Sequence, residues 1–414
     1  MVKTLHPLGL LSSRIGLSQA SRVRVEHDAA RLGTASAGLS DDAHAAAATR
    51  EAWQAPLDFP PLAQATVPGD RLAIAVDESV PLAAGVVRGM IDAAAEAGIS
   101  TDEISVVTTD TELAASLRAE LNGASGKSVQ VVIHDPDNQN DLCPIGQTRD
   151  GQWLRINRTL FEADVVLPIG CARLPGTSDG VSVYDSVFPR FSDTATIARL
   201  RKSSQRESPE RQAAARRQAE EAGWMLGMPL VMEVVPGSDG SVAAVVAGES
   251  AAVAAHCLEH CRRLWSYRVS RRASLVIATI TGGPIEQRWT NVARALAAAE
   301  QVVEDGGAVA ICSDLDTPPS RSLARHFGNE DWARVERDAA NDNSADGVAA
   351  WRLARALQRG PVYFLSQLEA DAVEELGLAP VANLEELQRL AQRHDSCLVV
   401  DDSQYVAMTV TGES

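Results

Sequence analysis

Short apolar segments alternate with segments of helical spacing along most of this chain of 414 residues, and this alternation is its most restrictive feature. The segment RLAIAVDES (71–79) predicts a strand, AAGVVRGMIDAAAEAG (83–98) a helix, and EISVVTTD (103–110) the next strand. The predicted strands are apolar on both faces, which is typical of a parallel sheet covered by helices on both sides. The sequence therefore predicts an α/β fold with mainly parallel sheets.

The alternation occurs in two blocks, which indicates two α/β domains. The first covers residues 1–265, with 1–55 as a poorly defined lead-in, and the second covers residues 270–414. Near the end of the first block, LVMEVVPGSDGSVAAVVAGE (230–249) predicts a β-hairpin. Because ligands of open α/β sheets bind at the carboxyl ends of strands, we expect a ligand site in an interdomain cleft.

The composition narrows the possible partners. A formal charge of −17 is unfavourable for binding phosphate backbones, so nucleic acid is not an expected partner. No apolar run is long enough to cross a bilayer, and no membrane partner is expected. Six cysteines in a chain of this length do not suggest a disulfide framework, which favours a reduced, cytoplasmic protein. The oligomeric state stays open.

Five residues are candidates for binding a small-molecule carboxylate. Asp77 ends the first strong strand, where it could accept a hydrogen bond from a substrate hydroxyl or simply cap a helix. Gly282 and Gly283 would let the backbone approach an anion at a helix start, and Asn291 and Arg294 follow on that helix. Arg294 could hold a carboxylate with two hydrogen bonds. A tight turn followed by a solvated helix explains the last four residues equally well.

Two strings resemble metal-binding sequences. HCLEHC (256–261) puts two histidines and two cysteines on one predicted helix, but a structural zinc site needs about four converging ligands. HDPDNQND (134–141) lacks the glycine and the final glutamate of a calcium loop. Buried cysteines and a turn explain these strings, so we assign no metal ligand. No dinucleotide fingerprint, phosphate loop or nucleophile elbow is present, and the motifs identify no catalytic residue.

Taken together, four stretches resemble the nickel-pincer lactate racemase (LarA-like) family, and the resemblance extends from about residue 56 to the end. They are GDRLAIAVDES (69–79), HDPDNQNDLCPIGQTRDGQWLRINRTLFEADVVLPIG (134–170), PIGCARLPGTSDGVSVYDSVFPR (168–190) and TITGGPIEQRWTNVARALAAAEQVVEDGGAVAI (279–311). The resemblance implies a 2-hydroxy acid racemase or epimerase. In that family a nickel-pincer nucleotide, tethered to a lysine, takes a hydride from the substrate and returns it, while a histidine takes the hydroxyl proton.

Several positions depart from the family pattern. Asp77 matches the family aspartate, and Asn291 and Arg294 conservatively replace a glutamine and a lysine. The other family positions carry different chemistry: Val80 for the substrate-binding arginine, Thr108–Thr111 for a catalytic histidine signature, Leu174 or Pro175 for a histidine, Tyr184 or Asp185 for the tethering lysine, and Arg199–Arg201 for a histidine ligand of the metal. The resemblance thus implies a divergent member that lacks most catalytic residues, and we assign no cofactor-binding residue.

Three functions are compatible with these observations. One is a racemase or epimerase whose cofactor site is degenerate. Another is a non-catalytic protein that binds a small carboxylate or metabolite on the same scaffold. A third is an enzyme with rebuilt chemistry on that scaffold.

Overall fold

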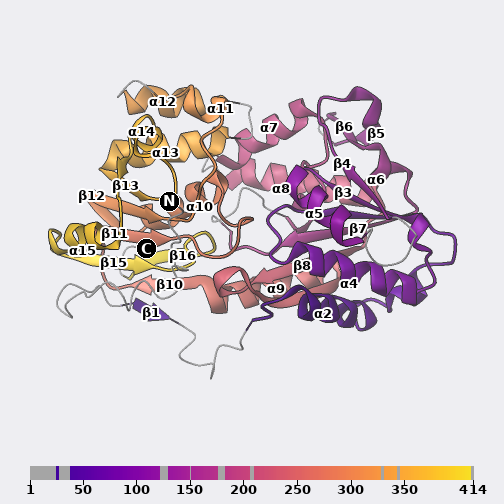
Figure 1. The fold of residues 1–414 in the computed structure, drawn as a ribbon. Coiled ribbons are helices and arrows are strands. Elements are labelled where there is room, and N and C mark those ends of the chain that lie inside the picture. The colour runs from indigo at the N-terminus through magenta and orange to yellow at the C-terminus, as the bar shows by residue number, and fades with distance from the viewer. Residues whose placement is uncertain are drawn as a thin grey trace. The chain divides into compact units, whose positions relative to one another are not determined.

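The computed structural model describes residues 25–27, 38–121, 129–149, 151–175, 182–205, 209–327, 331–342 and 346–411. This part of the chain divides into two compact units (Figure 1). The N-terminal unit holds residues 38–173 and 182–261. The C-terminal unit holds residues 262–411 together with strand β1 (Val25–His27).

A six-stranded sheet forms the centre of the N-terminal unit. Its order is β4 (Gln130–Ile133), β3 (Ile104–Thr108), β2 (Leu72–Val76), β7 (Val165–Cys171), β8 (Leu230–Pro236) and β9 (Val242–Glu249). The first five strands in this order are parallel to one another. The sixth, β9, runs antiparallel to β8 in the predicted hairpin. The prediction of an α/β fold with a mainly parallel sheet is confirmed here.

Helices cover both faces of this sheet because successive side chains of a strand point to opposite sides. Ile74 and Val76 pack in one apolar cluster with α2 (Asp42–Gln54), α4 (Ala83–Glu96) and α5 (Thr111–Leu121). Ala73 and Ala75 pack in a second cluster with α6 (Arg158–Glu162), η5 (Val183–Ser186), α7 (Thr194–Gln205) and α8 (Pro209–Met225). Strand β2 is therefore fully buried, as its apolar sequence predicts.

Part of the segment that the sequence describes only as a lead-in belongs to this core. Helix α2 lies against α4, and Trp53 is 1% exposed. Gly85 permits the approach, since a Cβ atom there would lie 2.3 Å from the carbonyl oxygen of Asp42. The alanine-rich composition of this segment concealed its packing role.

The remaining elements of the N-terminal unit lie at its edges. Strands β5 (Leu142–Gln147) and β6 (Trp153–Asn157) form a separate antiparallel hairpin. The short helices are α3 (Leu62–Ala65), η3 (Thr101–Glu103), η4 (Gln139–Asp141) and η6 (Ser238–Gly240). Helix α9 (Ser250–Trp265) continues the chain into the C-terminal unit.

The C-terminal unit contains a five-stranded parallel sheet. Its order is β14 (Ala379–Pro380), β13 (Val362–Leu365), β12 (Val303–Cys312), β11 (Ala273–Thr279) and β15 (Cys397–Val400). A small second sheet joins β1, β10 (Ser266–Val269) and β16 (Ala407–Val410). The helices are α10 (Trp289–Glu300), α11 (Arg321–Ala324), α12 (Trp332–Ala339), α13 (Gly347–Arg359), α14 (Ala370–Glu374) and α15 (Leu384–Gln392).

Each large sheet has one point where the strand order reverses. In the N-terminal unit the chain moves outward from β2 to β3 and β4, and later returns to place β7 on the other side of β2. In the C-terminal unit the same reversal lies between β11 and β15. Ligands of open α/β sheets bind beyond the carboxyl ends of strands at such points.

Among the helices of the described ranges, none combines the length and apolar character needed to cross a membrane.

Candidate functional site

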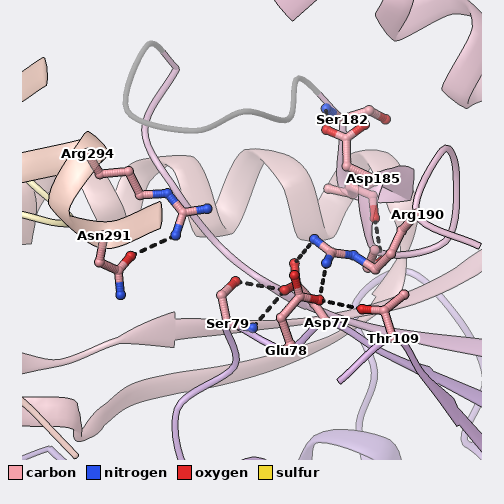
Figure 2. A network of polar contacts seen from close by, with 11 residues as sticks. Asp77, Glu78, Ser79, Thr109, Ser182, Asp185, Arg190, Asn291 and Arg294 are labelled. Carbon is pink, nitrogen blue, oxygen red and sulfur yellow. Dashed lines mark hydrogen bonds and ion pairs between the residues drawn. The ribbon is translucent and has the colours of Figure 1, made fainter. Parts of the chain in front are cut away.

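A buried arginine joins two carboxylates at the strand-order reversal of the N-terminal unit (Figure 2). Asp77 directly follows β2, and its Oδ2 accepts a hydrogen bond of 2.9 Å from Nη2 of Arg190. Nη1 of Arg190 donates to Oε2 of Glu78. Ser79 donates to Asp77 Oδ1 from its amide at 2.8 Å and its hydroxyl at 2.7 Å, and Thr109 donates to Glu78 at 3.1 Å. We call Asp77, Glu78 and Arg190 the ion-pair cluster.

The segment that carries Arg190 is fixed by apolar neighbours. Val187, Phe188 and Phe191 are each 0% exposed and belong to the cluster of buried residues on one face of the sheet. Only 21% of the Arg190 side chain is exposed, against 12% for Asp77. The segment around Arg190 therefore holds the guanidinium at the sheet edge, and it cannot move without exposing these buried side chains.

The charges of the ion-pair cluster stabilise one another. Burial alone would raise the pKa of Asp77, but Arg190 and the two donors of Ser79 outweigh it and hold the pKa below its ordinary value. Burial likewise opposes the charge on Arg190, yet the carboxylates of Asp77 and Glu78 raise its pKa. The contacts within the cluster thus favour the charged forms of Asp77 and Arg190.

Glu233 places a second kind of carboxyl group at the same edge. It lies on β8, is 6% exposed, and rests against Gly170 of β7, where a Cβ atom would be 2.2 Å from its Oε1. Burial raises the pKa of Glu233 well above its ordinary value, and the negative charges of Asp77 and Asp185 raise it further, while Arg173 opposes them. Burial therefore favours the protonated form of Glu233, in which the carboxyl group is a hydrogen-bond donor.

The four candidate residues of the C-terminal unit form one local arrangement. Gly282 has φ +95°, and the side chain of Glu286 lies against it, because a Cβ atom at Gly282 would be 2.8 Å from Glu286 Cγ. Gly283 accepts a hydrogen bond from the amide of Glu286, so these glycines lie in a turn that precedes α10. Asn291 is 5% exposed, donates to the Glu286 carbonyl at 2.8 Å, and accepts from Arg294 at 2.8 Å (Figure 2).

The strand-order reversal of the C-terminal unit is held by hydroxyl groups. Thr279 at the end of β11 donates to Asp401 at 3.0 Å, and Thr281 donates to Asp402, both of which follow β15. Burial raises the pKa of Asp401, although the Thr279 donor opposes this. Next to β12, Ser313 donates to Oε1 of Gln287 at 2.6 Å. The strand-end rule points to the stretches that contain Thr281 and Ser313, but the sequence analysis assigns no binding role to any of these residues.

The metal-like strings form no site within the described residues. No group of three or more His, Cys, Asp or Glu side chains there is arranged to hold a metal ion. In HCLEHC, Cys257 and Cys261 are buried, and burial raises the pKa of both thiols, that of Cys261 to about 12. His134 is 4% exposed, with Nε2 2.9 Å from the Ser192 carbonyl and Nδ1 3.2 Å from the Asn157 amide. The side chains of Cys257 and Cys261 in the first string, and of His134 in the second, therefore serve packing.

The positions that correspond to the tethering lysine are committed to other contacts. Tyr184 donates its hydroxyl to the carbonyl of Met228 at 3.2 Å, and its ring lies against Gly223. Asp185 accepts from the amide of Ser182 at 2.6 Å (Figure 2). Neither side chain can form an amine linkage, and nickel in such a site needs nitrogen or sulfur donors. The described residues at these positions therefore do not fit a nickel-pincer cofactor.

Sequence reasoning assigns no role to Glu78, Arg190 or Glu233, although Glu78 lies in the polar stretch Asp77–Ser79 that follows the first strand. Glu233 did leave a signal, since it is the single acid inside the otherwise apolar strand LVMEVVP. No sequence signal points to Arg190, because it is 113 residues from its partner Asp77 in the sequence.

Comparisons with known proteins agree with this architecture. Residues 19–202 match the family model of the lactate racemase N-terminal domain. The fold is similar to that of the lactate racemase apoprotein from Thermoanaerobacterium thermosaccharolyticum, with a TM-score of 0.68 and 19% identity over 90% of this chain and 93% of that one. A protein from Thermotoga maritima has a TM-score of 0.59 and 14% identity, over 82% of this chain and 93% of that one. No curated protein sequence matches significantly. The N-terminal part of the chain therefore resembles the lactate racemase N-terminal domain, and the described chain shares the fold of the lactate racemase apoprotein.

Proposed function

We propose that this LarA-like protein binds a small hydroxylated carboxylate without nickel-pincer chemistry. The observation that carries the proposal is the presence of two buried carboxyl groups of opposite tendency at one sheet edge: Glu233, whose protonated form is favoured by burial, and Asp77, which Arg190 keeps ionised. One group donates a hydrogen bond and the other accepts, which are the two functions that a hydroxy acid requires from its binding site.

Different residues of the site would bind different groups of the ligand. The Glu233 carboxyl donates its proton in a hydrogen bond to a ligand carboxylate oxygen, and the nearby charge of Arg173 favours that anion. Oδ2 of Asp77 retains a lone pair beyond the hydrogen bond from Arg190 and accepts from the ligand hydroxyl. Arg190 keeps Asp77 ionised and oriented. These residues bind and orient a ligand, and no proton has to leave any of them.

The resemblance of residues 19–202 to the lactate racemase N-terminal domain favours a second candidate, a 2-hydroxy acid racemase or epimerase that acts by hydride abstraction and return. When bound, the nickel-pincer nucleotide of the family supplies the hydride acceptor. The contacts of Tyr184 and Asp185 weigh against that chemistry here.

One preparation distinguishes the two candidates. The protein is co-produced with the enzymes that make the pincer nucleotide, and its nickel content and intact mass are measured. Its melting temperature is then recorded with D-lactate, L-lactate, glycolate and acetate. We expect no stoichiometric nickel and no mass adduct, together with a rise in melting temperature for the hydroxy acids that exceeds the rise for acetate.

Variants connect the result to the site. Glu233→Leu should abolish the rise, whereas Glu162→Gln, which changes an exposed carboxylate on α6, should keep it. Bound nickel with a mass adduct and interconversion of the lactate enantiomers would establish the racemase instead. If none of the acids raises the melting temperature, the proposed ligand class is wrong.

A further inference from the structure

A cavity of about 460 Å³ lies in the N-terminal unit, and none of its lining residues belongs to the ion-pair cluster. It is bordered by the β5–β6 hairpin, by η4 and by the start of α7. The lining residues are Gln139, Gly151, Gln152, Trp153, Arg155, Asp193, Ala195, Thr196 and Arg199. Its volume is within the range of about 300–1,000 Å³ that small-molecule sites occupy.

An exposed tryptophan borders this cavity. Along β6, Leu154 and Ile156 are each 0% exposed, so the alternation of the strand turns Trp153 and Arg155 to the opposite, outer face. Trp153 is 65% exposed. Because most of the Trp153 side chain is exposed, it contributes little to the stability of the hairpin. Its aromatic ring is available to stack on a planar ligand.

Two arginines border the same cavity, and each is oriented by a neutral amide. Arg155 donates to Oε1 of Gln139 at 2.6 Å, and Arg199 donates to Oε1 of Gln218 at 2.7 Å. A neutral amide fixes the direction of a guanidinium without cancelling its charge.

The single acidic lining residue, Asp193, accepts hydrogen bonds from its own helix and also attracts Arg199 electrostatically. Oδ1 of Asp193 accepts from the amide of Thr196 at 2.9 Å, and Oδ2 accepts from the hydroxyl of Thr196 at 3.0 Å. Two arginines and one aspartate leave the lining with a net charge of +1, on a chain whose formal charge is −17. The cavity is thus a locally basic site with an aromatic wall.

We propose that this cavity binds a planar aromatic ring that carries an anionic group, either a phosphate or a carboxylate. Trp153 stacks on the ring, and Arg155 and Arg199 hold the anion. A free mononucleotide and an aryl carboxylate share this chemistry, whereas a long polyanion is repelled by the charge of the rest of the chain. The site is independent of the function proposed above.

Calorimetric titration of the full chain with AMP, indole-3-acetate and inorganic phosphate tests this inference. We expect AMP or indole-3-acetate to bind, and whichever binds more tightly identifies the anionic group. Trp153→Ala should raise the dissociation constant about tenfold, since stacking on one aromatic side chain contributes about that much. Arg155→Gln should weaken binding by a similar factor.

Two matched controls occur in the same unit. Trp224→Phe changes another exposed tryptophan, and Arg149→Gln changes another exposed arginine, yet neither residue lines the cavity. Both variants should bind like the wild type. Inorganic phosphate that binds as tightly as AMP and independently of Trp153 would overturn the role of the ring. Absence of binding at millimolar concentrations of all three probes, or equal losses in the controls, would overturn the site.

Discussion

The two sheets reverse their strand order in the same way, but different chemistry stabilises each reversal. In the N-terminal unit, full charges meet between β2 and β7, where Arg190 contacts Asp77 and Glu78. In the C-terminal unit, hydroxyl groups of Thr279 and Thr281 meet the carboxylates that follow β15. The same topological position can thus be filled by an ion-pair cluster or by a hydrogen-bonded seam.

The difference shows where a ligand could be recognised. A buried ion-pair cluster contributes little net stability compared with apolar packing, because desolvation offsets the attraction between its charges. Its position beside Glu233, whose protonated form is favoured by burial, is consistent with a polar binding site. The hydrogen-bonded seam of the second sheet continues to Ser313 and Gln287, where the Ser313 hydroxyl and the Asp314 amide both donate to Gln287.

The largest effect should follow from removing the shared cation. Arg190→Met leaves two carboxylates without their partner, one of them largely buried, and should lower the free energy of unfolding by about 3–5 kcal/mol in urea denaturation at pH 7. The loss should shrink as the pH falls, because protonation removes the unpaired charges.

An exposed pair provides the matched control for Arg190. The side chains of Arg71 and Asp164 are 61% and 46% exposed, and their atoms approach to 3.1 Å. Arg71→Met should cost at most about 1 kcal/mol. If both arginine variants lose the same stability, burial does not distinguish the ion-pair cluster from a surface pair.

The second effect is a change in pH dependence. The folded-state pKa of Glu233 is raised, so the folded protein holds a proton that the unfolded chain releases above about pH 4.5. Wild-type stability therefore falls as the pH rises from that value toward the raised pKa. Glu233→Gln keeps the donor but cannot ionise. Relative to the wild type, it should gain up to about 1.4 kcal/mol for each pH unit in this window.

Urea denaturation between pH 5 and pH 8 measures that slope. Glu233→Leu should show the same flatter profile at a different absolute stability, because it also lacks the titrating group. Profiles of both variants that run parallel to the wild type would show that Glu233 is ionised in the folded protein.

The fold could be predicted much further than the site. Fully apolar strands such as Leu72–Val76, alternating with helical segments, are sufficient to predict a covered parallel sheet. The strand-end rule also selects Asp77. It cannot select Arg190, because the path of a loop decides which distant side chain reaches a strand end, and that path depends on packing by Phe188 and Phe191. Glu233 could have been selected, since an acid in a buried strand requires either a partner or a proton.

The smallest of the three main effects should come from the hydrogen-bonded seam of the C-terminal unit. Ser313 is 1% exposed, donates to Gln287 at 2.6 Å, and accepts from the amide of Leu315 at 3.2 Å. Ser313→Ala removes both hydrogen bonds and should cost about 1–2 kcal/mol. Because no ionisable group is lost, the cost should be the same at pH 6 and pH 8 and should not respond to added salt, unlike that of Arg190→Met. A cost that varies with pH as steeply as that of the arginine variant would mean that the two sheet edges do not differ in the way their contacts indicate.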